Sequence, residues 1–238
     1  MSVPILLENI ALTATISLPT ALEGAINRPR PTEVYDARLD WWSRKLLEAA
    51  DISLSVSGRE NLLANEAFVV MSNHQSHYDI PVLFQALGRR IRMVAKTELF
   101  KIPVFASAMR AAGFVEVDRK NRDRAVAALK GAKGAIDAGT DIWIAPEGTR
   151  SETGRVGPFK KGGFHMAEDA EARILPVTIE GTRRVLQAHD WRVKKSHHVS
   201  VVIGKPIDAP AYGPERRAEL MDAVRAAIVA PLPEALRG

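Results

Sequence analysis

Residues 68–83, FVVMSNHQSHYDIPVL, decide how this chain folds. The apolar run at 68–71 is short and followed by polar residues, which predicts a buried strand. Apolar residues begin again at Ile80, and Pro81 stands at an early position that helices favour. The stretch therefore predicts a strand, a loop and a helix, with His74 in the loop and Asp79 at the start of the helix.

The same alternation continues outward from residue 61. Further strands are expected at residues 91–95, 114–117, 142–145, 174–179 and 199–203. Helical patterns lie between them, at residues 80–87, 98–111, 121–138, 160–169 and 214–229. This order predicts an α/β fold in residues 61–238, with a largely parallel central sheet flanked by helices.

Residues 1–60 differ from the rest. Residues 3–25 are apolar with scattered threonines, and a breaker-rich link follows at 27–31. Residues 37–50 form an amphipathic pattern, with Leu39, Trp42 and Leu46 on one stripe. The early charge-free stretch is shorter than the roughly 20 residues that a transmembrane helix needs. We expect residues 1–60 to be an amphipathic segment that lies on a membrane. In the alternative, its tryptophans pack against the main domain.

Composition excludes several functions. The chain has 238 residues and no cysteine, so it has no disulfide framework, thiolate metal site or cysteine nucleophile. Its formal net charge of +5 favours an acidic partner: nucleic acid, an anionic membrane surface or a phosphorylated substrate. Serine-hydrolase, dinucleotide and P-loop motifs are absent, as is a secretory signal pattern.

His74 and Asp79 are the first candidates for chemistry. A carboxylate on one imidazole nitrogen fixes the tautomer and raises the basicity of the other nitrogen, as a general base requires. In the alternative, Asp79 only caps the helix. A metal site built on His74, His77 and Asp79 is a third interpretation, but no HExxH motif or further cluster completes it.

Two other patches follow predicted strands. The segment 146–151, PEGTRS, comes directly after the strand at 142–145, and Glu147 and Arg150 would lie at the carboxyl edge of the sheet. The segment 113–119, GFVEVDR, delivers Arg119 to a strand end, where a guanidinium can hold phosphate oxygens. Either patch could instead be an ordinary charged surface. The glycine-rich segment 157–163, GPFKKGG, could cradle an anion.

In this order, the patches resemble the sequence blocks of the 1-acylglycerol-3-phosphate acyltransferase (PlsC-like) family, over about residues 61–205. The NHxxxxD block matches Asn73, His74 and Asp79, the glycine-to-arginine block Gly113 and Arg119, the EGTR block Glu147, Gly148, Thr149 and Arg150, and the last block Pro176. The segment 96–103, KTELFKIP, is also similar to the family's sequence between its first two blocks.

The resemblance implies an enzyme that moves a fatty acyl group from acyl-CoA or acyl carrier protein to the sn-2 hydroxyl of 1-acylglycerol-3-phosphate, giving phosphatidic acid. It implies His74 as general base, supported by Asp79, without a covalent acyl-enzyme. Arg119 and Lys96 would bind the acceptor phosphate. The substrate-binding set would be completed by Glu147, Gly148, Thr149 and Arg150.

The resemblance also implies no metal, no cofactor and no nucleic-acid partner. It implies an anionic membrane surface as partner, with peripheral or monotopic attachment on the cytoplasmic side. Other acceptors, such as glycerol 3-phosphate or another lyso-lipid, stay open. So do two functions of other classes, a metal-dependent hydrolase and a non-catalytic lipid-binding module.

Overall fold

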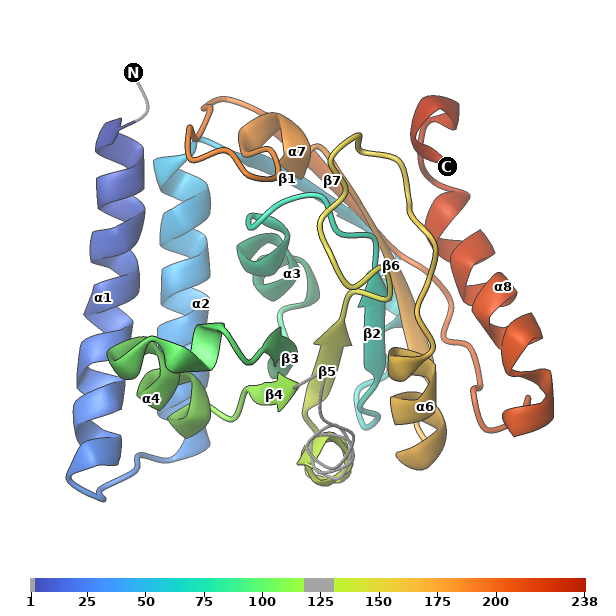
Figure 1. The fold of residues 1–238 in the computed structure, drawn as a ribbon, viewed down its shortest axis with the longest axis horizontal. Helices are drawn as coiled ribbons and strands as arrows, with labels where there is room; N and C mark the ends of the chain where they lie inside the picture. The colour runs from blue at the N-terminus through green and yellow to red at the C-terminus, as the bar shows by residue number, and fades with distance from the viewer. Residues whose placement is uncertain (1–2, 118–130) are drawn as a thin grey trace.

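A seven-stranded mixed sheet runs through the computed structural model, which describes residues 3–117 and 131–238 (Figure 1). The strands are β1 (Ser53–Ser57), β2 (Val69–Ser72), β3 (Ile91–Lys96), β4 (Val115–Val117), β5 (Asp141–Ile144), β6 (Ile174–Glu180) and β7 (His198–Ile203). Their spatial order is β1-β7-β6-β2-β5-β3-β4. Every neighbouring pair is parallel except β6 and β7. The predicted α/β fold with a largely parallel sheet is confirmed.

Helices connect most of these strands. The α-helices are α1 (Val3–Ala25), α2 (Thr32–Ala49), α3 (Asp79–Leu87), α4 (Pro103–Ala111), α6 (Gly162–Asp169), α7 (Thr182–Val185) and α8 (Arg217–Val229). Short 3-10 helices are η1 (Arg59–Asn61), η2 (Leu99–Lys101), η3 (Pro214–Arg216) and η4 (Glu234–Leu236). The predicted helix at 121–138 lies partly outside the described residues, and residues 131–137 are helical.

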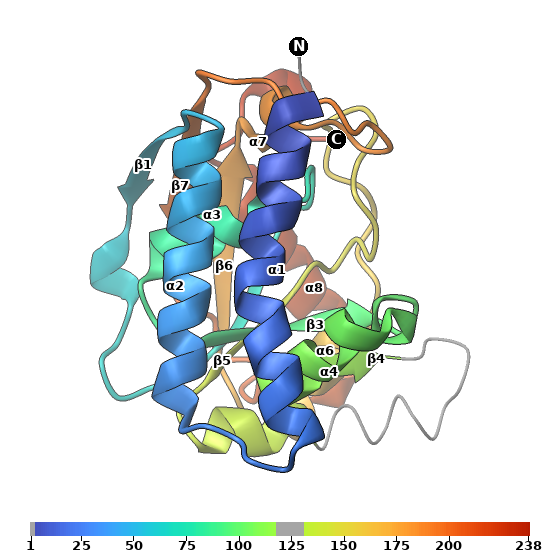
Figure 2. The same cartoon turned by 90° about the vertical axis from the view of Figure 1, so that its left-hand side faces the viewer.

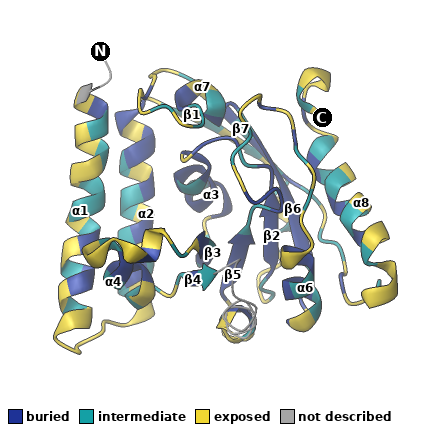
Figure 3. Ribbon diagram, viewed as in Figure 1, coloured by how far each residue is buried: buried dark blue, intermediate teal, exposed yellow. Residues whose placement is uncertain are grey.

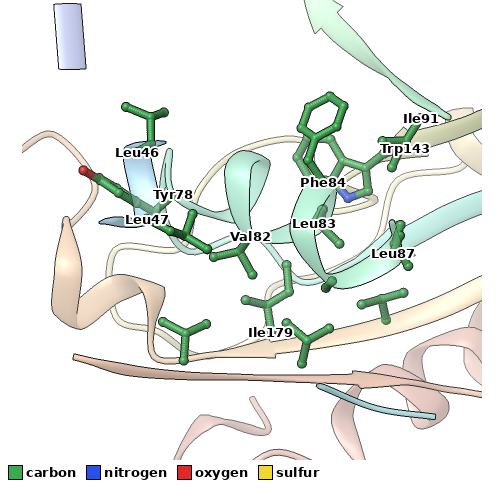
Figure 4. Close-up of a cluster of buried hydrophobic side chains, with 14 of the residues drawn as sticks. Leu46, Leu47, Tyr78, Val82, Leu83, Phe84, Leu87, Ile91, Trp143 and Ile179 are labelled. Carbon is green, nitrogen blue, oxygen red and sulfur yellow. The ribbon is translucent and has the colours of Figure 1, made fainter. Parts of the chain in front are cut away.

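Apolar side chains fill both faces of the sheet. One cluster joins α2 and α3 to the sheet, and Figure 4 shows Leu46, Val82, Leu83, Trp143 and Ile179 within it. A second cluster joins the other face to α6, α8 and residues 131–137. The central strands β2 and β6 are buried almost throughout, as Figure 3 shows. The sheet thus gives a rigid base for the loops that leave its carboxyl edge.

The sheet begins before residue 61. Strand β1 pairs with β7 and adds an edge strand that the sequence analysis did not predict. Its alternation of exposed and half-buried residues is typical of an edge strand with one solvated face. The α/β part therefore includes residues 53–57, which lie within the segment predicted as membrane-associating.

Helices α1 and α2 stand side by side against one flank of the molecule (Figure 2). The Arg38 guanidinium on α2 donates to both oxygens of Glu23 on α1, at 2.7 and 2.8 Å. Trp42 Nε1 donates to Thr13 Oγ1 at 3.0 Å, and its ring meets Phe84 edge-on. Trp42 therefore packs against the main domain rather than facing a membrane, as in the alternative interpretation of the sequence.

Helix α1 is apolar on two sides. Its inner side contributes Ile5, Leu12 and Ile16 to the core cluster. Its outer side exposes Leu7, Ile10, Leu18 and Leu22. By length and composition alone, residues 4–25 could cross a membrane, and only 17% of the most apolar window is buried within the protein. Only the charge-free part of this stretch, residues 9–22, was expected to be too short and too polar for a span; the helix itself covers 23 residues.

Candidate active site

Three neighbouring strands deliver the predicted motifs to one edge of the sheet. Strand β2 lies between β5 and β6, and both neighbours run parallel to it. The NHQSHYD loop leaves the end of β2, and the PEGTRS segment leaves the end of β5. Parallel strands place their carboxyl ends together, so the two predicted motifs meet there.

His74 and Asp79 form the pair that the sequence predicted. His74 Nδ1 lies 2.7 Å from Asp79 Oδ2. A carboxylate accepts only, so Nδ1 carries the proton and Nε2 has a free lone pair in the neutral ring. Within the described residues no hydrogen bond forms at Nε2, and the side chain is 16% exposed. The ring meets Trp143 edge-on, with centroids 5.5 Å apart. Nε2 is thus positioned as a proton acceptor.

Asp79 is completely buried and surrounded by donors. Besides His74, its Oδ2 accepts the backbone N–H groups of Gln75 at 2.7 Å and Ser76 at 2.9 Å. Its Oδ1 accepts the hydroxyl of Thr182, from the first turn of α7. Asp79 is the first residue of α3, so the helix N-terminus also favours its charge. Donors of this number and kind stabilise the ionised carboxylate.

Glu147 is buried and joins two loops. Its Oε1 accepts the backbone N–H of His74 at 2.8 Å, and its Oε2 accepts that of Gly157 at 2.8 Å. Burial raises the pKa of Glu147, while these two hydrogen bonds oppose the rise. Ser151 N–H also donates to the His74 carbonyl at 2.7 Å. The segment after β5 therefore holds the backbone of His74 from both sides.

Asn73 holds the other side of the loop. Its Nδ2 donates to the carbonyl of Ile179 and its Oδ1 accepts the N–H of the same residue, both at 2.8 Å. This side chain continues the pairing of β2 with β6 by one residue beyond the strand. Trp143 Nε1 donates to Ser72 Oγ at 2.9 Å, which fixes the indole beside His74. The loop is consequently tied to both neighbouring strands.

The remaining predicted residues are less constrained. Gly148 is buried at φ +75°, a backbone conformation that favours glycine, and its N–H donates to the Ala145 carbonyl at 2.9 Å. Thr149 is exposed and Arg150 is half-buried. Lys96 is exposed at the end of β3, where it pairs with Val117 of β4. Arg119 lies outside the described residues.

The pKa of His77 is affected by burial and by the charged groups of the site. Desolvation, with Arg150 and His74 adding, lowers the pKa of His77 to about 4. The ring is therefore neutral near pH 7. Across residues 3–117 and 131–238, no group of three or more His, Asp or Glu side chains is placed to hold a metal ion.

An apolar cavity of about 110 Å³ lies between the helix pair and the sheet. Its walls come from α1, α2, β3 and α4, and include Ile16, Leu39, Met93 and Met109. Ile80, which follows Asp79 directly, also lines it. The cavity therefore reaches the residue next to Asp79.

The contacts that reach the His74–Asp79 loop from β6 and α7 were not predicted from the sequence. Thr182 and Asn73 act through partners more than 100 positions away. The sequence did contain a signal for Thr182, because it lies two residues after a buried strand and the carboxyl ends of parallel strands share an edge. The strand order that puts β6 beside β2 was needed to use that signal.

Comparison with known proteins agrees with this architecture. The acyltransferase family model matches residues 53–180. The crystal structure of the 1-acyl-sn-glycerophosphate acyltransferase PlsC from Thermotoga maritima superposes with a TM-score of 0.77 and 25% identity, covering 95% of this chain and 92% of that one.

Relatives of known function agree as well. The chloroplastic 1-acyl-sn-glycerol-3-phosphate acyltransferase BAT2 of Brassica napus is 37% identical over 153 residues, which are 64% of this chain and 44% of that protein. The corresponding enzyme of Saccharomyces cerevisiae is 32% identical over 201 residues, covering 83% and 65%. The chain spans less than half the length of the plant relative. The family model matches more than half of the chain. This protein therefore belongs to the acyltransferase family, in the PlsC-like group that its motifs resemble.

Proposed function

We propose that this protein transfers a fatty acyl group from acyl-CoA or acyl carrier protein to the sn-2 hydroxyl of 1-acylglycerol-3-phosphate, giving phosphatidic acid. The observation that carries the proposal is the hydrogen bond between His74 and the buried Asp79; Nε2 has no partner within the described residues, and Ile80, next to Asp79, lines an apolar cavity. The plant and yeast proteins compared above are named 1-acyl-sn-glycerol-3-phosphate acyltransferases, and the Thermotoga protein a 1-acyl-sn-glycerophosphate acyltransferase, which supports this acceptor.

His74 acts as the general base. Nε2 takes the proton of the acceptor hydroxyl as its oxygen attacks the thioester carbonyl. The resulting tetrahedral oxyanion collapses, the carbon–sulfur bond breaks, and the thiolate leaves with the proton from the imidazolium. Asp79 stabilises the imidazolium and keeps the ring in the required tautomer. No acyl-enzyme forms, since transfer is direct.

The other predicted residues serve binding and positioning. Arg119 and Lys96 bind the acceptor phosphate, because a guanidinium and an ammonium suit a phosphomonoester. Glu147 positions His74 through its backbone rather than by touching the acceptor, since both carboxylate oxygens are already engaged. Gly148 forms the turn after β5. Thr149 and Arg150 face the substrates from the rim of the site.

The apolar cavity receives an acyl chain. Its walls are almost entirely apolar, and Ile80 brings it next to the reacting pair. A fatty chain placed there leaves water, which is favourable at roughly 25 cal/mol per Å² of apolar surface buried.

The outer side of α1 rests on an anionic membrane surface. Leu7, Ile10, Leu18 and Leu22 are 56–61% exposed, on a helix whose other side is also apolar. A surface helix that exposes an apolar stripe of this size fits a lipid surface better than water. The exposed Ile102 and Val104 lie at the start of α4, which packs against α1. We place the protein on the cytoplasmic side, peripheral or monotopic, where both substrates meet it.

The test uses the purified full chain with labelled acyl-CoA and 1-acylglycerol-3-phosphate in mixed micelles containing EDTA. Wild type should form phosphatidic acid, and His74→Ala should lose about 10²–10⁴-fold in turnover. Activity that disappears in EDTA would favour a metal-dependent reaction. Equal activity in the variant would remove His74 as base.

A negative result for wild type leads to a second round with acyl carrier protein as donor, and with glycerol 3-phosphate or other lyso-lipids as acceptor. If no donor and acceptor pair gives product while the protein still binds anionic vesicles, the lipid-binding alternative replaces the enzyme.

A further inference from the structure

The carboxylate of Asp79 is held by donors from two different parts of the chain. All three donors to Oδ2 come from its own loop: His74, Gln75 and Ser76. Among the described residues, the only donor to Oδ1 is the hydroxyl of Thr182, 103 positions away. Without that hydroxyl, a fully buried carboxylate oxygen would lose its partner.

Thr182 is itself locked in place. It is completely buried and begins α7 directly after Gly181, which has φ +107°. A Cβ on Gly181 would lie 2.5 Å from the His198 carbonyl oxygen, so the turn between β6 and α7 can pass β7 only with glycine there. The end of β6 is also fixed, because Asn73 holds both backbone groups of Ile179. Thr182 therefore approaches Asp79 from a rigid support.

We infer that Thr182 is a positioning residue for the His74–Asp79 pair: its hydroxyl fixes the orientation of the Asp79 carboxylate and so the aim of Oδ2 at Nδ1. The inference rests on the proposed role of His74 as base. A carboxylate held by Oδ2 alone could turn about its Cβ–Cγ bond, and the imidazole would follow. With Oδ1 held, the turn is blocked and Nε2 keeps its direction toward the acceptor hydroxyl.

The test compares Thr182→Val, which keeps the shape and removes the hydroxyl, with Thr182→Ser, which keeps the hydroxyl. Loss of a charge-assisted hydrogen bond should lower kcat of Thr182→Val about 10- to 100-fold. The KM values for both substrates should change less than about threefold, because Thr182 touches neither substrate. Thr182→Ser should stay within about threefold of wild type in kcat, since it retains the donor.

The pH profile of kcat/KM separates positioning from simple loss of stability. Removing a donor from the carboxylate leaves more of its negative charge to stabilise the imidazolium. The acid limb should therefore shift to higher pH in Thr182→Val and stay in place in Thr182→Ser.

Thr178→Val is the matched control. Thr178 is also buried on β6, but its hydroxyl donates to the Ile228 carbonyl in α8, at 2.7 Å. This variant should lose comparable thermal stability while keeping kcat within about threefold and the pH profile of wild type. If Thr182→Val gives no folded protein, Thr182→Cys replaces it, because a thiol of similar size is only a weak donor.

Two results would overturn the inference. One is a Thr182→Val or Thr182→Cys variant with the kcat and pH profile of wild type; the other is a loss of kcat in Thr182→Ser as large as that in Thr182→Val. Neither is confused with failure of the proposed function, because that failure appears as an inactive wild type or a fully active His74→Ala.

Discussion

The loop at 73–79 and the helix pair α1–α2 stand next to each other but are stabilised in opposite ways. Polar contacts from β5, β6 and α7 hold the loop, and almost every donor and acceptor around Asp79 has a partner. The helix pair is held mainly by apolar packing, with a few polar ties, and leaves large apolar side chains exposed. The two regions meet at Asn9 of α1, whose side chain donates to the Tyr78 hydroxyl at 2.8 Å.

The difference fits the two tasks proposed for these regions, proton transfer at the loop and lipid contact at the helix pair. Proton transfer needs reacting groups held to fractions of an ångström, and hydrogen bonds provide that directionality. Contact with a lipid surface needs apolar area and tolerates variation in angle and depth. Each region can therefore be perturbed without the other.

The largest effect is expected from Asp79→Asn, which breaks the polar region. The amide removes the charge that stabilises the imidazolium and presents donors to neighbouring N–H groups. Turnover should fall by about 10²–10⁴-fold, measured as phosphatidic acid formed per minute. The control is Asp141→Asn, another buried aspartate, at the amino end of β5. If both variants lose activity equally, general loss of folding explains the result.

Breaking the apolar region comes next. In Leu18→Gln combined with Leu22→Gln, two exposed leucines of α1 lose their apolar surface. Binding to vesicles of phosphatidylcholine and phosphatidic acid should weaken on the order of 10- to 100-fold in co-sedimentation. Turnover with a water-soluble short-chain acceptor should stay within about threefold. Leu63→Gln, at an exposed leucine outside α1, should bind vesicles like wild type. Unchanged binding by the double variant would count against α1 as the contact surface.

A smaller effect is expected from Glu147→Gln, which sharpens the comparison within the polar region. The substitution replaces one of the two accepting oxygens with an NH₂ group. That group then faces a backbone N–H, either of His74 or of Gly157, and the two donors cannot pair. Turnover should fall about tenfold, since such a mismatch costs about 1–3 kcal/mol. Glu168→Gln, which changes a glutamate paired with Arg217 on another face, should not alter turnover. If the variant instead raised only the KM for the acceptor and left kcat unchanged, Glu147 would be a substrate ligand.

The smallest effect on catalysis is expected at Asp141, where a buried carboxylate has fewer donors. Phe68 N–H donates to it at 2.9 Å and Arg89 Nε lies 3.2 Å away, but burial dominates and raises its pKa to about 6. Its contribution to the free energy of unfolding is thus greatest below about pH 4 and is lost as pH rises through about 6. Relative to Asp141→Asn, wild type should lose on the order of 1–3 kcal/mol between pH 4 and 7 in urea unfolding. A difference independent of pH would contradict this assignment.

Local sequence was sufficient for much of this protein. The alternation of apolar runs and helical patterns predicted six of the seven strands, because strand and helix periods are set by nearby residues. The short spacing from His74 to Asp79 predicted their contact, since a five-residue turn limits how far the two side chains can separate. The family followed from the motifs in their order.

Tertiary structure decided what depends on partners distant in the chain. Strand β1 was missed because its register with β7 joins residues more than 140 positions apart. The roles of Glu147, Asn73 and Thr182 follow from β5 and β6 flanking β2, and strand order is not encoded in any local pattern. The sequence by itself named the His74–Asp79 pair. Only the folded sheet, which brings the ends of three parallel strands to one edge, determined what keeps that pair in place.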